Sequence, residues 1–144
     1  MRNRTRARGW ALQALYAWEQ RGGQPEMAIP VLHELFTNLR VSPANRPYSE
    51  ILVRLVGTNV ERIDATIVEA LTNWRLERLA VVDRAILRLG TAEMMFVDDV
   101  PARLVIREMV QLAEKYGTHE SARFVNGVLD AVMRKVAPGE AAGA

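Results

Sequence analysis

Apolar residues recur along this chain at the three- and four-residue spacing of an α-helix, and no segment shows the sustained alternation of a strand. In the opening segment, one such stripe faces a core and consists of Ala7, Trp10, Ala11, Ala14, Leu15 and Trp18. Proline and glycine interrupt the pattern at only a few places, so the connections are short. The chain is therefore restricted to an all-α fold, and we expect a bundle of about seven helices.

Helix-breaking and capping residues set the expected boundaries. The first helix ends at Gly22-Gly23, Pro30 marks a later start or a kink in the second, and residues 57–59 divide the third helical stretch. We expect Gly117 to end a helix in the left-handed conformation and Thr118 to cap the last helix. The expected helices cover residues 4–21, 25–39, 48–72 (as two), 76–96, 101–116 and 119–136, with a loop at 41–47 and a flexible tail at 137–144.

Residue types needed for catalysis and metal binding are scarce. The chain has no cysteine, which excludes disulfides, thiolate nucleophiles and thiolate metal sites. His33 and His119 are far apart in sequence, no serine lies in a nucleophile motif, and no phosphate- or dinucleotide-binding glycine loop occurs. We therefore expect no catalytic residue, no metal site, no cofactor and no enzymatic activity.

Hydropathy argues against a membrane protein. The longest unbroken apolar run, residues 14–18, is far too short to cross a bilayer, and the basic N-terminus lacks the apolar segment of a secretory signal. Together with the absence of cysteine, these features are compatible with a cytoplasmic location.

Positive charge is concentrated at the N-terminus. Residues 1–21 carry five arginines and one glutamate, a net charge of +4, whereas the other 123 residues carry a net charge of −2. A basic segment on a slightly acidic body favours an electrostatic contact with an anionic partner. A solvated helix terminus is the alternative interpretation.

The first helix gathers polar residues on one face. At about 3.6 residues per turn, the residues opposite the apolar stripe are Arg2, Arg6, Gly9, Gln13 and Tyr16, and those nearer its edge are Arg4 and Arg8. Arginine neutralises phosphate, glutamine offers a donor and an acceptor to a base edge, and tyrosine offers a stacking surface. With one short basic element and no helix-turn-helix pattern, this face fits single-stranded RNA better than a duplex groove. The alternative is packing for Tyr16 and simple solvation for Gln13.

Three groups of residues resemble the NusB family of bacterial transcription antitermination factors. They are Arg4-Thr5-Arg6-Ala7-Arg8 with Ala11-Leu12-Gln13-Ala14-Leu15-Tyr16; Trp74-Arg75-Leu76-Glu77-Arg78-Leu79 with residues 82–90 and Glu93; and Val100-Pro101 with residues 108–117 and 124–130. The resemblance implies a NusB-like helical domain over residues 1–136, with two lobes at about 1–73 and 74–136. The chain departs from the family at Arg107, where Asn is more common.

The resemblance also implies a function. Members of this family are non-enzymatic factors that bind boxA RNA, notably in ribosomal RNA leaders, together with the small ribosomal protein NusE. The pair joins RNA polymerase and suppresses premature termination in the cytoplasm. Homodimerisation is left open, because some family members dimerise and others do not. Since a NusB-like domain also occurs fused to a ribosomal RNA methyltransferase, a stand-alone domain for ribosomal RNA maturation or a helical protein-interaction module is the alternative.

The resemblance assigns an RNA-binding role to the opening helix. Arg4, Arg6 and Arg8 match the family's RNA-contacting segment, and Gln13 and Tyr16 match the polar face beside it. We expect Arg6 and Arg8 to be dispensable for the core.

In the last helix, Phe124 and Asn126 match a signature that lies beside the RNA surface. Phe124 is about 120° from that helix's core stripe, which favours an exposed ring for stacking. The alternatives are packing at the edge of the core for Phe124 and a helix-packing hydrogen bond for Asn126.

Acidic residues in the central signature are candidates for a partner surface. Glu77, Asp83 and Glu93 could meet a basic ribosomal protein. Asp83 and Glu93 could equally be internal ion-pair partners of Arg84 or Arg88.

Overall fold

The structure is a computed structural model that describes residues 2–142. This part of the chain contains eight α-helices, three short 3-10 helices and no strand, so the expected all-α class is confirmed. The chain divides into two compact units, Met1–Val60 and Glu61–Ala144. The sequence-based lobes instead divide near residue 73. Within residues 2–142, none of the helices is both long and apolar enough to cross a membrane.

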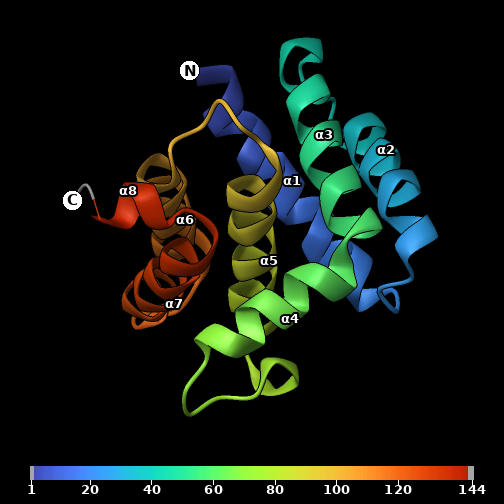
Figure 1. The fold of residues 1–144 in the computed structure, drawn as a ribbon. Coiled ribbons are helices and arrows are strands. Elements are labelled where there is room, and N and C mark those ends of the chain that lie inside the picture. Colours follow the sequence, from blue (N-terminus) through green and yellow to red (C-terminus); the bar gives the residue numbers. More distant parts are fainter. Residues whose placement is uncertain (1, 143–144) are drawn as a thin grey trace. The chain divides into compact units, whose positions relative to one another are not determined.

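The first unit is built from three helices that pack on one another in pairs (Figure 1): α1 (Arg2–Gln20), α2 (Ala28–Asn38) and α3 (Arg46–Thr58). The 3-10 helices η1 (Pro25–Met27) and η2 (Pro43–Asn45) precede α2 and α3. The apolar stripe of α1 is buried, as the spacing predicted, except that Trp10 is half-buried. The Ser49 hydroxyl donates a 2.7 Å hydrogen bond to the Ala7 carbonyl, which ties α3 to α1.

The turn after α1 needs two glycines. Gly22 and Gly23 have φ angles of +106° and +66°, a region in which a side chain is strained. The Trp18 indole N–H donates to the Gln24 carbonyl at 2.7 Å, which holds the end of the turn against α1. Because η1 occupies the next residues, α2 begins only at Ala28 and Pro30 falls in its first turn, where proline is tolerated.

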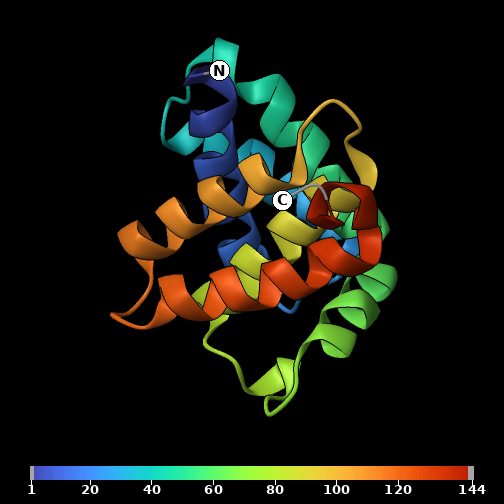
Figure 2. The same ribbon diagram turned by 60° about the vertical axis from the view of Figure 1, so that its left-hand side comes forward.

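The second unit begins at the second residue of α4 (Val60–Ala70). It also contains η3 (Leu76–Arg78), α5 (Val81–Phe96), α6 (Ala102–Tyr116), α7 (Ser121–Val136) and α8 (Pro138–Ala142). Helices α5, α6 and α7 pack pairwise. Figure 2 shows α6 and α7 as neighbouring antiparallel helices, with α8 at the end of α7. On α5, Arg88 donates two 2.9 Å hydrogen bonds to the carboxylate of Asp64 and so fixes α4 to α5.

The connection between α6 and α7 corrects two expectations. Gly117 is extended (φ −91°, ψ −168°) rather than left-handed. A Cβ there would lie 2.5 Å from the Cβ of Ser121, so a close approach explains the glycine. Thr118 does not cap a helix at His119, because α7 begins at Ser121. Instead the Thr118 N–H donates to the Ser121 hydroxyl at 2.9 Å.

A short helix follows α7, in a segment where the sequence predicted no helix. Residues 138–142 form α8, and the Glu140 carboxylate accepts a 2.8 Å hydrogen bond from the backbone N–H of Ala102. This bond satisfies a donor in the first turn of α6 that has no intrahelical partner. Residues 138–142 belong to the segment that the sequence predicted as a flexible tail, and its last two residues, 143–144, lie outside the described residues.

Candidate nucleic-acid interface

One face of α1 carries the predicted polar residues. Arg2 and Arg6 are exposed, Tyr16 is 40% exposed, and Gln13 is half-buried between them along the helix. These residues lie opposite the buried stripe, so the helical spacing placed this face correctly. The face offers cations, an amide and a phenol ring along one helix.

Arg4 is held by an aromatic ring of the same unit. Its guanidinium carbon lies 4.4 Å from the centroid of the Tyr48 ring, a cation–π contact. Tyr48 comes from the first turn of α3 and is itself buried. Sequence reasoning missed Tyr48, because nothing near it in the chain points to the arginines of α1.

Arg8 differs from the other two arginines of the predicted site. It is only 3% exposed, and its guanidinium carbon lies 5.5 Å from the centroid of the same Tyr48 ring. On the helical wheel Arg8 falls between Leu12 and Leu15, both of which are buried. The expectation that Arg8 is dispensable for the core is therefore wrong.

The basic segment's last arginine is paired. Arg21 donates to both carboxylate oxygens of Glu34, at 3.0 Å and 2.7 Å. These hydrogen bonds, and then the attraction between the charges, lower the pKa of Glu34 and raise the pKa of Arg21. The open positive charge of the segment is thus concentrated toward the N-terminal end of α1.

Phe124 meets an aromatic partner within the second unit. It is half-buried in the first turn of α7, and its ring lies 5.8 Å from the ring of Trp74 at an interplanar angle of 73°, an edge-to-face contact. Trp74 is 60% exposed. Asn126 is exposed two residues further along α7. The tryptophan is a further candidate site residue, which the sequence presented only as part of a motif.

Of the acidic candidates, two are accessible. Glu77 is exposed and lies 3.7 Å from Arg75, a weak surface pair. Asp83 is half-buried, and its Oδ1 atom is buried with no hydrogen-bond partner among residues 2–142. An acceptor of this kind is costly to bury unless a donor reaches it.

Glu93 is not available to a partner. It is fully buried and is engaged in interactions inside the protein. Its assignment to a partner surface is therefore corrected. The neighbouring arginines of α5 also act internally, because Arg88 pairs with Asp64 and Arg84 donates to the carbonyls of Leu76 and Leu79.

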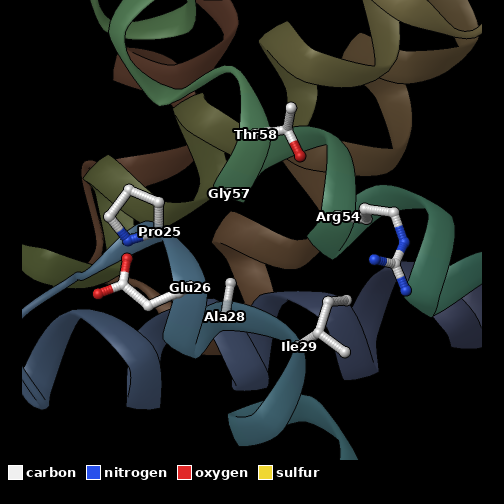
Figure 3. Close-up of a pocket in the computed structure, with 7 residues that line it drawn as sticks. All are labelled: Pro25, Glu26, Ala28, Ile29, Arg54, Gly57 and Thr58. Carbon is white, nitrogen blue, oxygen red and sulfur yellow. The ribbon is translucent and has the colours of Figure 1, made fainter.

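A separate hollow lies in the first unit, beside α3 (Figure 3). Its volume is about 230 Å³, and it is lined by Pro25, Glu26, Ala28, Ile29, Arg54, Gly57 and Thr58. It brings one cation and one carboxylate together without an aromatic ring. Since none of these residues belongs to α1, Arg54 is a useful control for the arginines of the α1 face.

Comparison with known proteins identifies the family to which this chain is similar. The NusB family model matches residues 5–134. A transcription antitermination protein NusB of Sorangium cellulosum is 41% identical over 133 residues, which is 92% of this chain and 93% of that protein. Its counterpart in Pseudothermotoga lettingae is 37% identical and covers 97% of both chains.

Solved structures agree with the sequence relatives. The T. maritima NusB structure matches with a TM-score of 0.84 and 34% identity, over 98% of this chain and 97% of that one. A structure of the antitermination factors NusB and NusE in complex with double-stranded RNA matches with a TM-score of 0.83 and 32% identity, over 94% of this chain and 98% of that one. With near full-length matches in both sequence and fold, this chain belongs to the NusB family of transcription antitermination proteins.

Proposed function

We propose that this protein is a cytoplasmic transcription antitermination factor that binds single-stranded boxA RNA together with NusE and supports RNA polymerase on ribosomal RNA operons. The family membership supports this role, and a relative whose structure contains NusE and double-stranded RNA supports NusE and RNA as partners. No catalytic step is part of the proposal.

The observation that carries the proposal is the open polar face of α1. Arg2 and Arg6 present two exposed cations, and the ring of Tyr48 positions a third, Arg4. Gln13 and Tyr16 continue the same face with an amide and a ring. Cations for phosphates beside a hydrogen-bonding group and a stacking surface are the combination by which proteins bind unpaired RNA.

Arg8 has a supporting part in this proposal. Because it is buried against the ring that also holds Arg4, it acts on RNA through the position of Tyr48 rather than by meeting a phosphate in the open. Phe124, half-buried, and Asn126, exposed, are the proposed RNA contacts within the second unit.

Glu77 and Asp83 are the proposed contacts to NusE. Glu77 is exposed and Asp83 is half-buried, with its Oδ1 atom buried inside the protein. A basic ribosomal protein would supply positive groups to Glu77 and to the accessible part of Asp83.

The decisive experiment measures binding of labelled boxA RNA by fluorescence anisotropy, with a scrambled RNA as reference, in the presence and absence of NusE. We expect tighter binding to boxA, strengthened by NusE. Arg6→Ala should weaken boxA binding by about 5- to 10-fold, since one charge-assisted contact contributes roughly 1 kcal/mol at an exposed site. Arg54→Ala removes an exposed arginine from α3 and should leave binding unchanged.

Two results would contradict the proposal. Equal losses in Arg6→Ala and Arg54→Ala would mean that only total charge matters. Binding of NusE without any preference for boxA would instead favour a helical protein-interaction module.

A further inference from the structure

The second unit has a groove that the α1 face does not explain. Its volume is about 360 Å³, and it is bounded by the segment before α5, by the first turn of α5 and by the start of α7. This volume lies at the lower end of the range of roughly 300–1,000 Å³ that is typical of small-molecule pockets. The groove therefore has room for one small planar group.

Trp74 is the unusual residue of this groove. It is 60% exposed, the largest exposed fraction among the large apolar side chains of the described residues. Its only ring contact among residues 2–142 is the edge-to-face contact with Phe124 at 5.8 Å, and Trp74 lines the groove while much of the residue is exposed to solvent. In an aromatic pair of this kind, the half-buried ring supports the exposed ring, and the exposed ring can stack on a planar group.

The charges around the platform favour a nucleotide. Arg78 and Arg123 line the groove, and both side chains are exposed. Asp83 and Glu120 line it as well. The carboxylates disfavour a phosphate inside the groove, whereas the arginines can hold phosphates at its margin. A base can thus enter the groove while its backbone stays outside.

We infer that Trp74, together with Phe124, stacks on one unpaired nucleobase of the bound RNA. This inference rests on the proposed RNA-binding function and adds Trp74 as the residue that contacts the base. Arg123 and Arg78 hold the flanking phosphates. Stacking requires no particular base, because every base has a π-face.

The test compares full-length wild-type protein, Trp74→Ala and Trp74→Phe in binding to labelled boxA RNA. Loss of one base–aromatic stack should weaken binding by about 5- to 150-fold in Trp74→Ala, while Trp74→Phe should retain most of the affinity. Tyr116→Ala is the matched control, because Tyr116 is an exposed aromatic residue of the same unit that does not line the groove. Its boxA affinity should match that of the wild type.

A second measurement identifies the stacked base. In a series of boxA RNAs, each RNA lacks the base at one position. For one RNA of the series, wild-type protein and Trp74→Ala should bind with the same low affinity. This convergence is expected only if Trp74 contacts the missing base. A purely structural role for Trp74 would lower affinity by the same factor for every RNA in the series.

The possible outcomes separate this inference from the proposed function. If Arg6→Ala weakens boxA binding and Trp74→Ala does not, the inferred stacking on Trp74 is wrong, while the proposed RNA contact of α1 is supported. If Trp74→Ala loses NusE binding in the absence of RNA while boxA affinity is unchanged, the groove belongs to a protein partner and the inference is overturned. If wild-type protein shows no preference for boxA, both fail together.

Discussion

At the scale of single residues, two arginines two positions apart on α1 have different environments. Arg6 is exposed, whereas Arg8 is 3% exposed and packed near Tyr48. Arginine is therefore a surface residue at position 6 and an interior residue at position 8.

Replacement of these arginines should separate binding from stability. We expect Arg8→Ala to lower the free energy of unfolding by about 1–3 kcal/mol, because it empties a buried site and removes a cation–π contact. Arg6→Ala should change it by less than about 0.5 kcal/mol. Urea unfolding followed by circular dichroism measures both, and equal midpoints for the two variants would refute the distinction.

The pair of Arg21 and Glu34 makes a prediction about pH. The hydrogen bonds from Arg21 lower the pKa of Glu34 in the folded protein. The pair therefore stabilises the fold above the ordinary pKa of glutamate, and this contribution is lost as the pH falls through the lowered value. Both side chains of the pair are exposed to solvent, so the effect on stability is small.

A titration of the Glu34 carboxyl carbon by NMR tests this directly. We expect its pKa to be below the ordinary value of glutamate in the wild type and to rise in Arg21→Gln. A Glu34 pKa that does not respond to Arg21→Gln would show that the hydrogen bonds do not form in solution.

At the scale of helices, two glycines inside helices should respond oppositely to the same substitution. A Cβ at Gly90 of α5 would lie 2.8 Å from Cγ of Met109 and 3.0 Å from Cδ1 of Leu129, where α5 meets α6 and α7. A Cβ at Gly127 of α7 would meet nothing within 4 Å. One glycine permits close helix packing, and the other only weakens its helix.

We expect Gly90→Ala to destabilise the protein by about 1–3 kcal/mol through overpacking. Gly127→Ala should stabilise it by about 0.5–1 kcal/mol, because alanine has the higher helix propensity. Thermal unfolding of both variants shows whether each substitution raises or lowers the stability. A stabilised Gly90→Ala would mean that α5 can shift away from its neighbours.

Element boundaries show what local sequence can and cannot predict. The break between α3 and α4 and the end of α6 at Tyr116 follow from residues at those positions, and both are found. The extended Gly117 and the helix α8 depend on contacts with residues elsewhere, Ser121 in one case and Ala102 in the other. Likewise the polar face of α1 was predictable from helical spacing, whereas Tyr48 and the Trp74–Phe124 contact are tertiary features.

At the scale of the whole molecule, the net charge of +2 says little about RNA binding. What matters is where the cations remain open, since Arg21 and Arg88 are paired with carboxylates while Arg2 and Arg6 are exposed. Binding of RNA by such exposed cations releases counterions and weakens as salt increases.

We therefore expect the logarithm of the boxA affinity to fall linearly with the logarithm of salt concentration. Arg6→Ala should reduce the slope by about 0.7, the value for one phosphate contact to a single strand. Trp74→Ala should weaken binding without changing the slope, because stacking releases no counterion. Anisotropy titrations at several potassium chloride concentrations measure both, and an unchanged slope in Arg6→Ala would exclude its phosphate contact.

The contact between Arg4 and Tyr48 has a consequence for the thermodynamics of recognition. An arginine that is free in solution loses rotational freedom when it grips a ligand, and that loss opposes association. Here the guanidinium already packs on the Tyr48 ring, 4.4 Å from its centroid, before any ligand is bound. The entropy of ordering this side chain is thus lost when the protein folds and not when the RNA binds. The helix therefore presents one preorganised cation to its ligand.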